Sequence, residues 1–64
     1  MKLGDRVVLL MYPVYGQAGE LSEELKHEQL DGFWLIKLDI PTIYEGKSIT
    51  HIAMREKNMR LEDE

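Results

Sequence analysis

Residues Asp31-Gly32-Phe33-Trp34-Leu35-Ile36-Lys37-Leu38-Asp39 contain the only Trp and the only Phe of this chain of 64 residues. The stretch opens on a turn dipeptide and continues as a strand with a two-residue period. Side chains of a strand alternate between its two faces. One face carries the predicted core residues Trp34, Ile36 and Leu38. The opposite face carries Phe33 and Leu35, more apolar surface than a solvated face needs, and these two residues are candidates for an interface.

The length of the chain predicts one domain over residues 1–64. A domain of this size buries only about 60% of the surface of its unfolded chain, and its core supplies about 3–5 kcal/mol. The chain has no Cys, so disulfides and Cys-based zinc sites are excluded. We therefore expect stability to come from a well-packed core, from association with a partner, or from both.

The N-terminal segment does not have the pattern of a signal peptide. Its apolar run, residues 7–11, is shorter than the apolar region of such peptides and precedes no small-residue cleavage site. No segment approaches the roughly 18 apolar residues of a membrane span. We expect a soluble cytoplasmic protein that does not contact a membrane, and the absence of Cys fits a reducing compartment.

The charge of the chain is concentrated in one segment. The net charge is −4, and residues 20–31 carry all of it, because the remaining charges cancel. Nucleic-acid binding draws much of its affinity from neutralising phosphates. An acidic chain without a basic stripe therefore argues against a nucleic-acid partner.

The first predicted strand covers residues 6–12 and is apolar on both faces. We assign Val8 and Leu10 to the core and Val7 and Leu9 to the outer face. A strand that is apolar on both faces is covered on both. It therefore either crosses between two halves of a small barrel or meets another subunit.

Two structures remain open for residues 20–30. Ser22 followed by two Glu residues is a helix start, whereas a strand over 18–25 and an acidic turn form the arm of a hairpin. We favour the strand, because Gly19 and the turn at Asp31-Gly32 bracket it. The acidic segment either folds over the face of Phe33 and Leu35 or leaves it exposed, and the sequence weighs these two outcomes evenly.

The second half of the chain alternates strands with turns. Pro41 is predicted to end the central strand, and a loop over residues 42–48 follows, with Glu45-Gly46-Lys47 at its tip. A strand over 49–54, a one-turn 3-10 helix over 55–58 and a short strand over 59–62 complete the chain. Residues 62–64 are expected to fray. These segments add the predicted core residues Ile52, Met54 and Leu61.

The pattern predicts an all-β fold, a small barrel of about five short strands. The opening Gly4-Asp5-Arg6-Val7-Val8, the second strand after Gly19, the Trp-bearing strand and the final strand-turn-strand resemble small SH3-like barrels, including KOW-type domains. Glu20-Leu21-Ser22 departs from the family pattern, which has Thr-Val and a further hydrophobic residue there. The KOW resemblance implies a nucleic-acid-associated accessory domain as an alternative function.

No residue pattern indicates catalysis. The runs Glu23-Glu24 and Glu62-Asp63-Glu64 are predicted to be solvated, which leaves their carboxylates without the shifted pKa that acid–base work needs. His27 is predicted to be exposed and His51 partly buried, and their spacing is not that of metal ligands. No nucleophile motif, phosphate loop or dinucleotide motif is present. We expect no enzyme activity, no cofactor, no metal and no small-molecule substrate.

The function that we predict is a non-catalytic interaction module. SH3 domains bind proline-rich peptides in an aromatic groove, and the tyrosines of the loop over 12–16 are candidates to line one. We favour instead Tyr12 in the core and the loop tyrosines packed over the barrel end. The module pairs with itself, as a homodimer, or with a protein partner. Its predicted interface residues are Phe33, Leu35, Val7, Leu9, Tyr15 and Tyr44.

Overall fold

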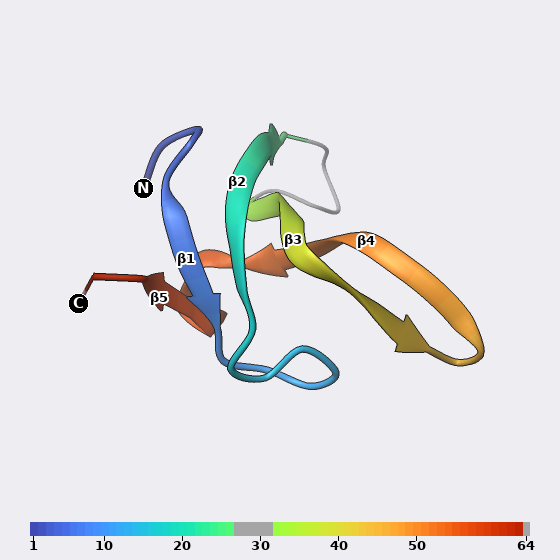
Figure 1. The fold of residues 1–64 in the computed structure, drawn as a ribbon. Coiled ribbons are helices and arrows are strands. Elements are labelled where there is room, and N and C mark those ends of the chain that lie inside the picture. The colour runs from blue at the N-terminus through green and yellow to red at the C-terminus, as the bar shows by residue number, and fades with distance from the viewer. Residues whose placement is uncertain (27–31, 64) are drawn as a thin grey trace.

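Five antiparallel strands and one 3-10 turn make up the computed structural model, which describes residues 1–26 and 32–63 (Figure 1). The elements are β1 (Arg6–Leu9), β2 (Ala18–Leu25), β3 (Phe33–Tyr44), β4 (Lys47–Arg55), the turn η1 (Glu56–Asn58) and β5 (Met59–Leu61). The prediction of an all-β fold is confirmed. Within the described ranges, no helix is long and apolar enough to cross a membrane.

The strands form one sheet in the order β4-β3-β2-β1-β5. The last strand returns to the first, with Val7 opposite Leu61 and Leu9 opposite Met59. The sheet is strongly curved, and β2 and β3 bend across the molecule (Figure 1). The β2–β3 register shifts between Leu21 and Glu23, a bulge of the kind that bends a strand. At this bulge the Ser22 hydroxyl donates a hydrogen bond of 3.0 Å to the carbonyl of Leu35.

Each predicted strand has a counterpart in the structure, and the strand predicted over 49–54 lies within β4. The strand over 18–25 is confirmed as β2, so the alternative of a helix that starts at Ser22 is wrong. The one-turn helix predicted over 55–58 is η1, and the short last strand is β5. The acidic turn predicted after residue 25 lies mostly in 27–31, outside the described residues.

The prediction that Pro41 ends the central strand is wrong, because β3 continues to Tyr44. The β3–β4 register shifts between Lys37 and Thr42, so Pro41 lies where the ladder is interrupted and its missing N–H costs no ladder bond. The loop predicted over 42–48 is in fact a turn of two residues, Glu45 and Gly46, whose φ values are 51° and 75°. Two consecutive positive φ values are typical of the type I′ turn of tight hairpins.

The first strand is shorter than predicted and faces the other way. Val7 and Leu9 are fully buried, whereas Val8 is partly exposed and Leu10 is 39% exposed. Residues directly opposite each other in an antiparallel pair share a face. Because Met59 points into the core and lies opposite Leu9, Leu9 must point into the core as well. Leu10 lies beyond the ladder, and its N–H donates to the carbonyl of Asn58 at 2.9 Å.

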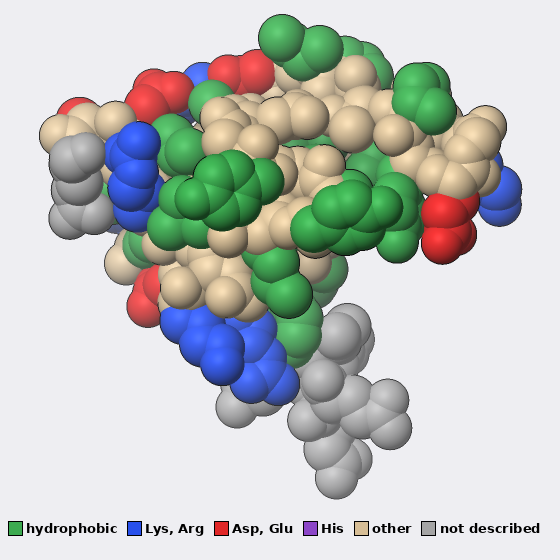
Figure 2. All heavy atoms as spheres, turned by 90° about the horizontal axis from the view of Figure 1, so that it is seen from below, with side chains coloured by type: hydrophobic (Ala, Val, Ile, Leu, Met, Phe, Trp, Pro, Cys, Tyr) green, Lys and Arg blue, Asp and Glu red, His purple; other side chains and the backbone are tan. Residues whose placement is uncertain are grey.

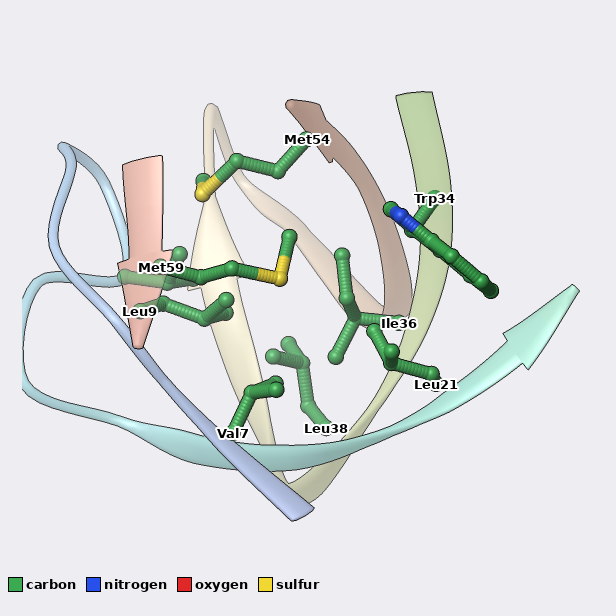
Figure 3. Close-up of a cluster of buried hydrophobic side chains, with 9 residues drawn as sticks. Val7, Leu9, Leu21, Trp34, Ile36, Leu38, Met54 and Met59 are labelled. Carbon is green, nitrogen blue, oxygen red and sulfur yellow. The ribbon is translucent and has the colours of Figure 1, made fainter. Parts of the chain in front are cut away.

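The core lies in the space that the curved strands enclose, where the labelled side chains converge (Figure 3). Four of the predicted core residues, Trp34, Ile36, Leu38 and Met54, are buried, and Ile52 and Leu61 are partly buried and pack against them. Val14 adds a fully buried side chain from the loop between β1 and β2. The complete set of buried hydrophobic residues is Val7, Leu9, Val14, Leu21, Trp34, Ile36, Leu38, Met54 and Met59.

β2 approaches β3 closely at Gly19. A Cβ atom at this position would lie 2.6 Å from Cγ2 of Ile36 and 2.7 Å from the carbonyl oxygen of Lys37. Any side chain would therefore displace the backbone of β3. Glycine at this position lets β2 pack tightly against the middle of the central strand.

Candidate functional site

A hollow on the surface lies beside the end of β4, and we call it the β4 groove. It combines residues from four parts of the chain: the loop after β1, the start of β3, the end of β4 and the turn η1. Its lining residues are Met11, Tyr12, Phe33, Ile52, Ala53, Met54, Arg55, Lys57 and Asn58. These residues bring together aliphatic side chains, two aromatic rings and two cations.

The lining from β4 shows that the groove follows the edge of this strand. Four consecutive residues, from Ile52 to Arg55, line it. Successive side chains of a strand point to opposite faces, so a hollow over one face would meet only every second residue. Because all four residues line the groove, the groove runs along the edge of the strand. Since β4 is the first strand in the sheet order, that edge is the one without a ladder partner among the described residues.

Backbone hydrogen bonds hold the loop between β1 and β2 as one wall of the groove. The N–H of Gly16 donates to the carbonyl of Leu9 at 2.7 Å, and the N–H of Val14 donates to the carbonyl of Met11 at 3.1 Å. The buried side chain of Val14 anchors the loop from below. Met11 and Tyr12 consequently point outward, and Tyr12 is 76% exposed, so our placement of Tyr12 in the core is wrong.

Tyr12 also connects the groove to the β3–β4 hairpin. Its ring meets the ring of Tyr44 edge to face, with the centroids 5.9 Å apart and an angle of 78° between the planes. The hydroxyl of Thr42 donates to Oε1 of Gln17 at 2.9 Å and fastens the end of β3 to the same loop. The loop between β1 and β2 is therefore held by its own backbone hydrogen bonds and by side-chain contacts with the β3–β4 hairpin.

Figure 2 shows hydrophobic side chains gathered over one face of the molecule, with basic side chains at several points around its border. The most exposed large hydrophobic residues of the loop and the hairpin are Tyr12, Tyr15, Ile40 and Ile43. Contiguous apolar surface of this kind marks interaction sites in soluble proteins.

The charged side chains that line the groove are both cationic. Cζ of Arg55 lies 5.0 Å from the centroid of the Phe33 ring, a cation–π arrangement that orients the guanidinium group. Lys57 extends from η1. Glu56, between these two residues in sequence, lies 3.6 Å from the N-terminal amino group of Met1. The described lining thus contains no carboxylate, although the chain as a whole carries a net charge of −4.

A separate cluster of charges lies across β1, β3 and the end of β5. Nη1 of Arg6 donates to Oδ1 of Asp39 at 2.8 Å, and a second bond joins Nη2 to Oδ2. Nε of Arg6 donates to Oε1 of Glu62 at 3.4 Å. The hydrogen bonds from Arg6 lower the pKa of Asp39, and those to Asp39 and Glu62 raise the pKa of Arg6. This cluster links β1 with β3 and with the residue after β5, and Arg6, Asp39 and Glu62 are not among the residues that line the groove.

The structure divides the predicted interface residues. Val7 and Leu9 are fully buried, so their assignment to an interface is wrong. Phe33 lines the groove. Tyr44 is not part of the lining, but its ring contacts the ring of Tyr12, which is. Leu35 is partly exposed on β3, opposite Ala53.

Tyr15 is exposed on the loop, outside the groove lining. Phe33 is the one residue of the described groove lining that we predicted for the interface. We predicted Tyr12, Ile52 and Met54 for the core, and we made no prediction for Met11, Ala53, Arg55, Lys57 and Asn58. The Tyr12-Pro13 pair was the available signal, because a proline after the apolar run marks the point where strand alternation stops applying.

The histidines contribute no metal site to the described part of the chain. His51 is exposed rather than partly buried, and its Nδ1 lies 2.9 Å from the hydroxyl oxygen of Thr50. His27 lies outside the described residues. Over residues 1–26 and 32–63, no three His, Cys, Asp or Glu side chains form a group that could hold a metal ion.

The chemistry that the site offers is that of a binding surface: ring faces, aliphatic side chains, two cations and a strand edge. No protein-family model, curated protein or solved structure matches the chain.

Proposed function

We propose that this chain is a non-catalytic protein-interaction module with the architecture of a small SH3-like barrel. The return of β5 to the side of β1 and the 3-10 turn before β5 support this architecture. They agree with the resemblance of the Gly4-Asp5-Arg6-Val7-Val8 segment to the opening strand of such barrels. The partner in this proposal is a protein segment that occupies the β4 groove.

One observation carries the proposal: an apolar hollow coincides with a strand edge that has no ladder partner in the part of the chain that the structure describes. Met11 and Tyr12 are held outward by the hydrogen bonds of their own loop, so their exposure is built into the fold. Exposed aromatic side chains beside a hollow are the usual anchors of protein interfaces. An edge strand offers backbone donors and acceptors to a second chain.

Self-association through Phe33 and Leu35 is a narrower version of the same proposal. Both side chains are partly exposed, and Phe33 lies opposite Leu25 of β2 and Arg55 of β4. Size-exclusion chromatography with light scattering tests this version. A concentration-dependent dimer that the double variant Phe33→Ser/Leu35→Ser abolishes supports it, and a monomer at high micromolar concentration excludes it.

The nucleic-acid-associated alternative rests on one feature of the groove. Exposed rings beside cations provide stacking platforms for unpaired bases, and Tyr12, Arg55 and Lys57 form such a set. The net charge of −4 opposes this alternative. Binding of a fluorescent single-stranded oligonucleotide that weakens steeply with salt would favour it over a protein partner.

Selection from a displayed library of random peptides tests the protein-interaction proposal. We expect enriched peptides whose binding weakens about thirtyfold, or by about 2 kcal/mol, in the double variant Met11→Ser/Tyr12→Ser. The control is Ile40→Ser/Ile43→Ser, which removes comparably exposed apolar side chains outside the groove. A selection that enriches no peptide, or peptides equally sensitive to both variants, contradicts a binding role for the groove.

A further inference from the structure

We propose that the free edge of β4 accepts an extended segment of alternating acidic and apolar residues as an additional strand. This inference rests on the proposed function and names the chemistry of the partner. It follows from three observations: the groove runs along a strand edge, the two faces of that strand differ, and the charged lining is cationic.

The edge of β4 is suited to receive a strand. The β3–β4 ladder is regular from Phe33 opposite Arg55 to Lys37 opposite His51, so the backbone of β4 is extended beside the groove. β4 contains no proline, and β-branched residues are frequent in it. A chain that pairs with such an edge gains main-chain hydrogen bonds, and its alternating side chains provide specificity.

The two faces of β4 predict the alternation of the partner. Ile52 and Met54 point to the core side, and both belong to or pack against the buried cluster. Ala53 and Arg55, which alternate with them, point to the outer side. Residues directly opposite each other in a ladder share a face. The incoming strand therefore places apolar side chains opposite Ile52 and Met54 and an acidic side chain opposite Arg55.

Charge complementarity predicts that the polar residues of the incoming strand are acidic. The guanidinium group of Arg55 is oriented by the Phe33 ring, and Lys57, two residues further along the chain, also lines the groove. The adjacent Glu56 is engaged by the N-terminal amino group. A carboxylate on the incoming strand meets two cations there, whereas a lysine or arginine in its place would meet like charge.

The probe for this proposal is a synthetic heptapeptide that alternates Glu and Val, acetylated and amidated at its ends. It is titrated into the ¹⁵N-labelled protein and followed by NMR. We expect the largest shifts at the amides of Ile52–Arg55 and of Met11 and Tyr12. A lysine–valine heptapeptide of the same length should bind at least tenfold more weakly.

Two changes separate strand addition from simple charge attraction. Methylation of alternate backbone nitrogens of the peptide, on the edge that would face β4, removes ladder donors and leaves every charge in place. We expect this peptide to bind at least tenfold more weakly. The same methylation on the opposite edge is the control, and equal binding by the two methylated peptides overturns strand addition.

Charge reversal in the protein tests the acidic half of the pattern. The double variant Arg55→Glu/Lys57→Glu should lose the glutamate–valine peptide and gain the lysine–valine peptide. Lys37→Glu/Lys47→Glu changes the net charge equally outside the groove lining and should leave the preference unchanged. An equal effect of both variants reduces the preference to net charge and overturns the inference.

The failure of this inference is distinguishable from the failure of the proposed function. The peptide library can yield groove-dependent binders that lack acidic residues or that tolerate methylation. Such binders would support the protein-interaction function and overturn strand addition. If neither the library peptides nor the heptapeptide bind at the groove, the proposed function and the strand-addition inference are both overturned.

Discussion

The two edges of the sheet, β5 and β4, differ in their length and in the surface beside them. β5 has three residues and is followed by Glu62, which accepts hydrogen bonds from Arg6. β4 has nine residues, and its C-terminal half lines an apolar groove. Short length and charge are the usual devices that protect a sheet edge from pairing with other chains. The β5 edge has both devices, whereas the β4 edge is long and its charge beside the groove is limited to Arg55 and the adjacent Lys57.

The two sides of the sheet also differ in whether their apolar residues are buried or exposed. On the β5 side, apolar residues of β1 and β5 such as Leu9 and Met59 are buried in the core. On the β4 side, the loop and the hairpin leave Tyr12, Ile40 and Ile43 exposed. A chain of this size has little stability to spare, so exposed apolar residues that add nothing to the core point to a role outside folding.

The largest expected effect is on the β5 side. Leu9→Ala removes a fully buried side chain and should lower the free energy of unfolding by about 3 kcal/mol, most of what a domain of this size has. Urea denaturation followed by the fluorescence of Trp34 measures the change. Leu10→Ala, at the exposed neighbouring position, is the matched control and should cost much less. The reverse order would show that β1 faces the other way.

The next effect concerns the contact between β2 and β3. Gly19→Ala should cost about 2 kcal/mol, because the added methyl group meets the backbone carbonyl of Lys37 and β3 has to move. Gly46→Ala is the comparison, since no atom lies within 4 Å of its added Cβ and only its positive φ is strained. Thermal unfolding of the two variants distinguishes a packing cost from a backbone cost. A Gly19→Ala variant as stable as the wild type would contradict the tight approach at Gly19.

On the β4 side, the same kind of change should leave stability almost untouched. Tyr12→Ser should change the free energy of unfolding by no more than about 0.5 kcal/mol, because the side chain is largely exposed. Denaturation under the conditions used for Leu9→Ala gives the comparison. A loss as large as that of Leu9→Ala would mean that Tyr12 packs in the core and would remove the main anchor of the groove.

The smallest effect is the pH dependence of the charge cluster. Because Arg6 lowers the pKa of Asp39 in the folded state, the pair stabilises the fold above the ordinary carboxyl pKa of about 4. This contribution is lost as the pH falls through the lowered pKa. Arg6→Met should therefore flatten the decrease of the melting temperature below about pH 4. Lys47→Met, which removes a charge without touching Asp39, should keep the wild-type slope.

Much of the fold could be predicted from the sequence, because strand alternation is a local property. The alternation in residues 33–39 places Trp34, Ile36 and Leu38 on the buried face. The face of β1 could not be predicted in the same way, since residues 7–11 are all apolar and the pairing of Leu9 with Met59 selects the buried face. The extension of β3 past Pro41 depends on the interrupted ladder, which is likewise a property of pairing.

The candidate site was less predictable than the core. Phe33 stood out because its face carries surplus apolar residues, and the structure places it in the groove. Tyr12 follows an apolar strand in sequence, yet the hydrogen bond from Gly16 to Leu9 turns it outward. Arg55 at the end of β4 and Lys57 in η1 both line the groove, and no sequence pattern connects them with the loop after β1.

The ladder between β1 and β5 has a consequence for the order of folding. The β3–β4 hairpin joins residues that are close in sequence across a two-residue turn, whereas β1 and β5 come from opposite ends of the described chain. Closing a long loop costs entropy before its contacts repay it. The hairpin is therefore suited to form first and β5 to join last. In the nascent protein, the protected edge would be completed after the edge that is open to partners.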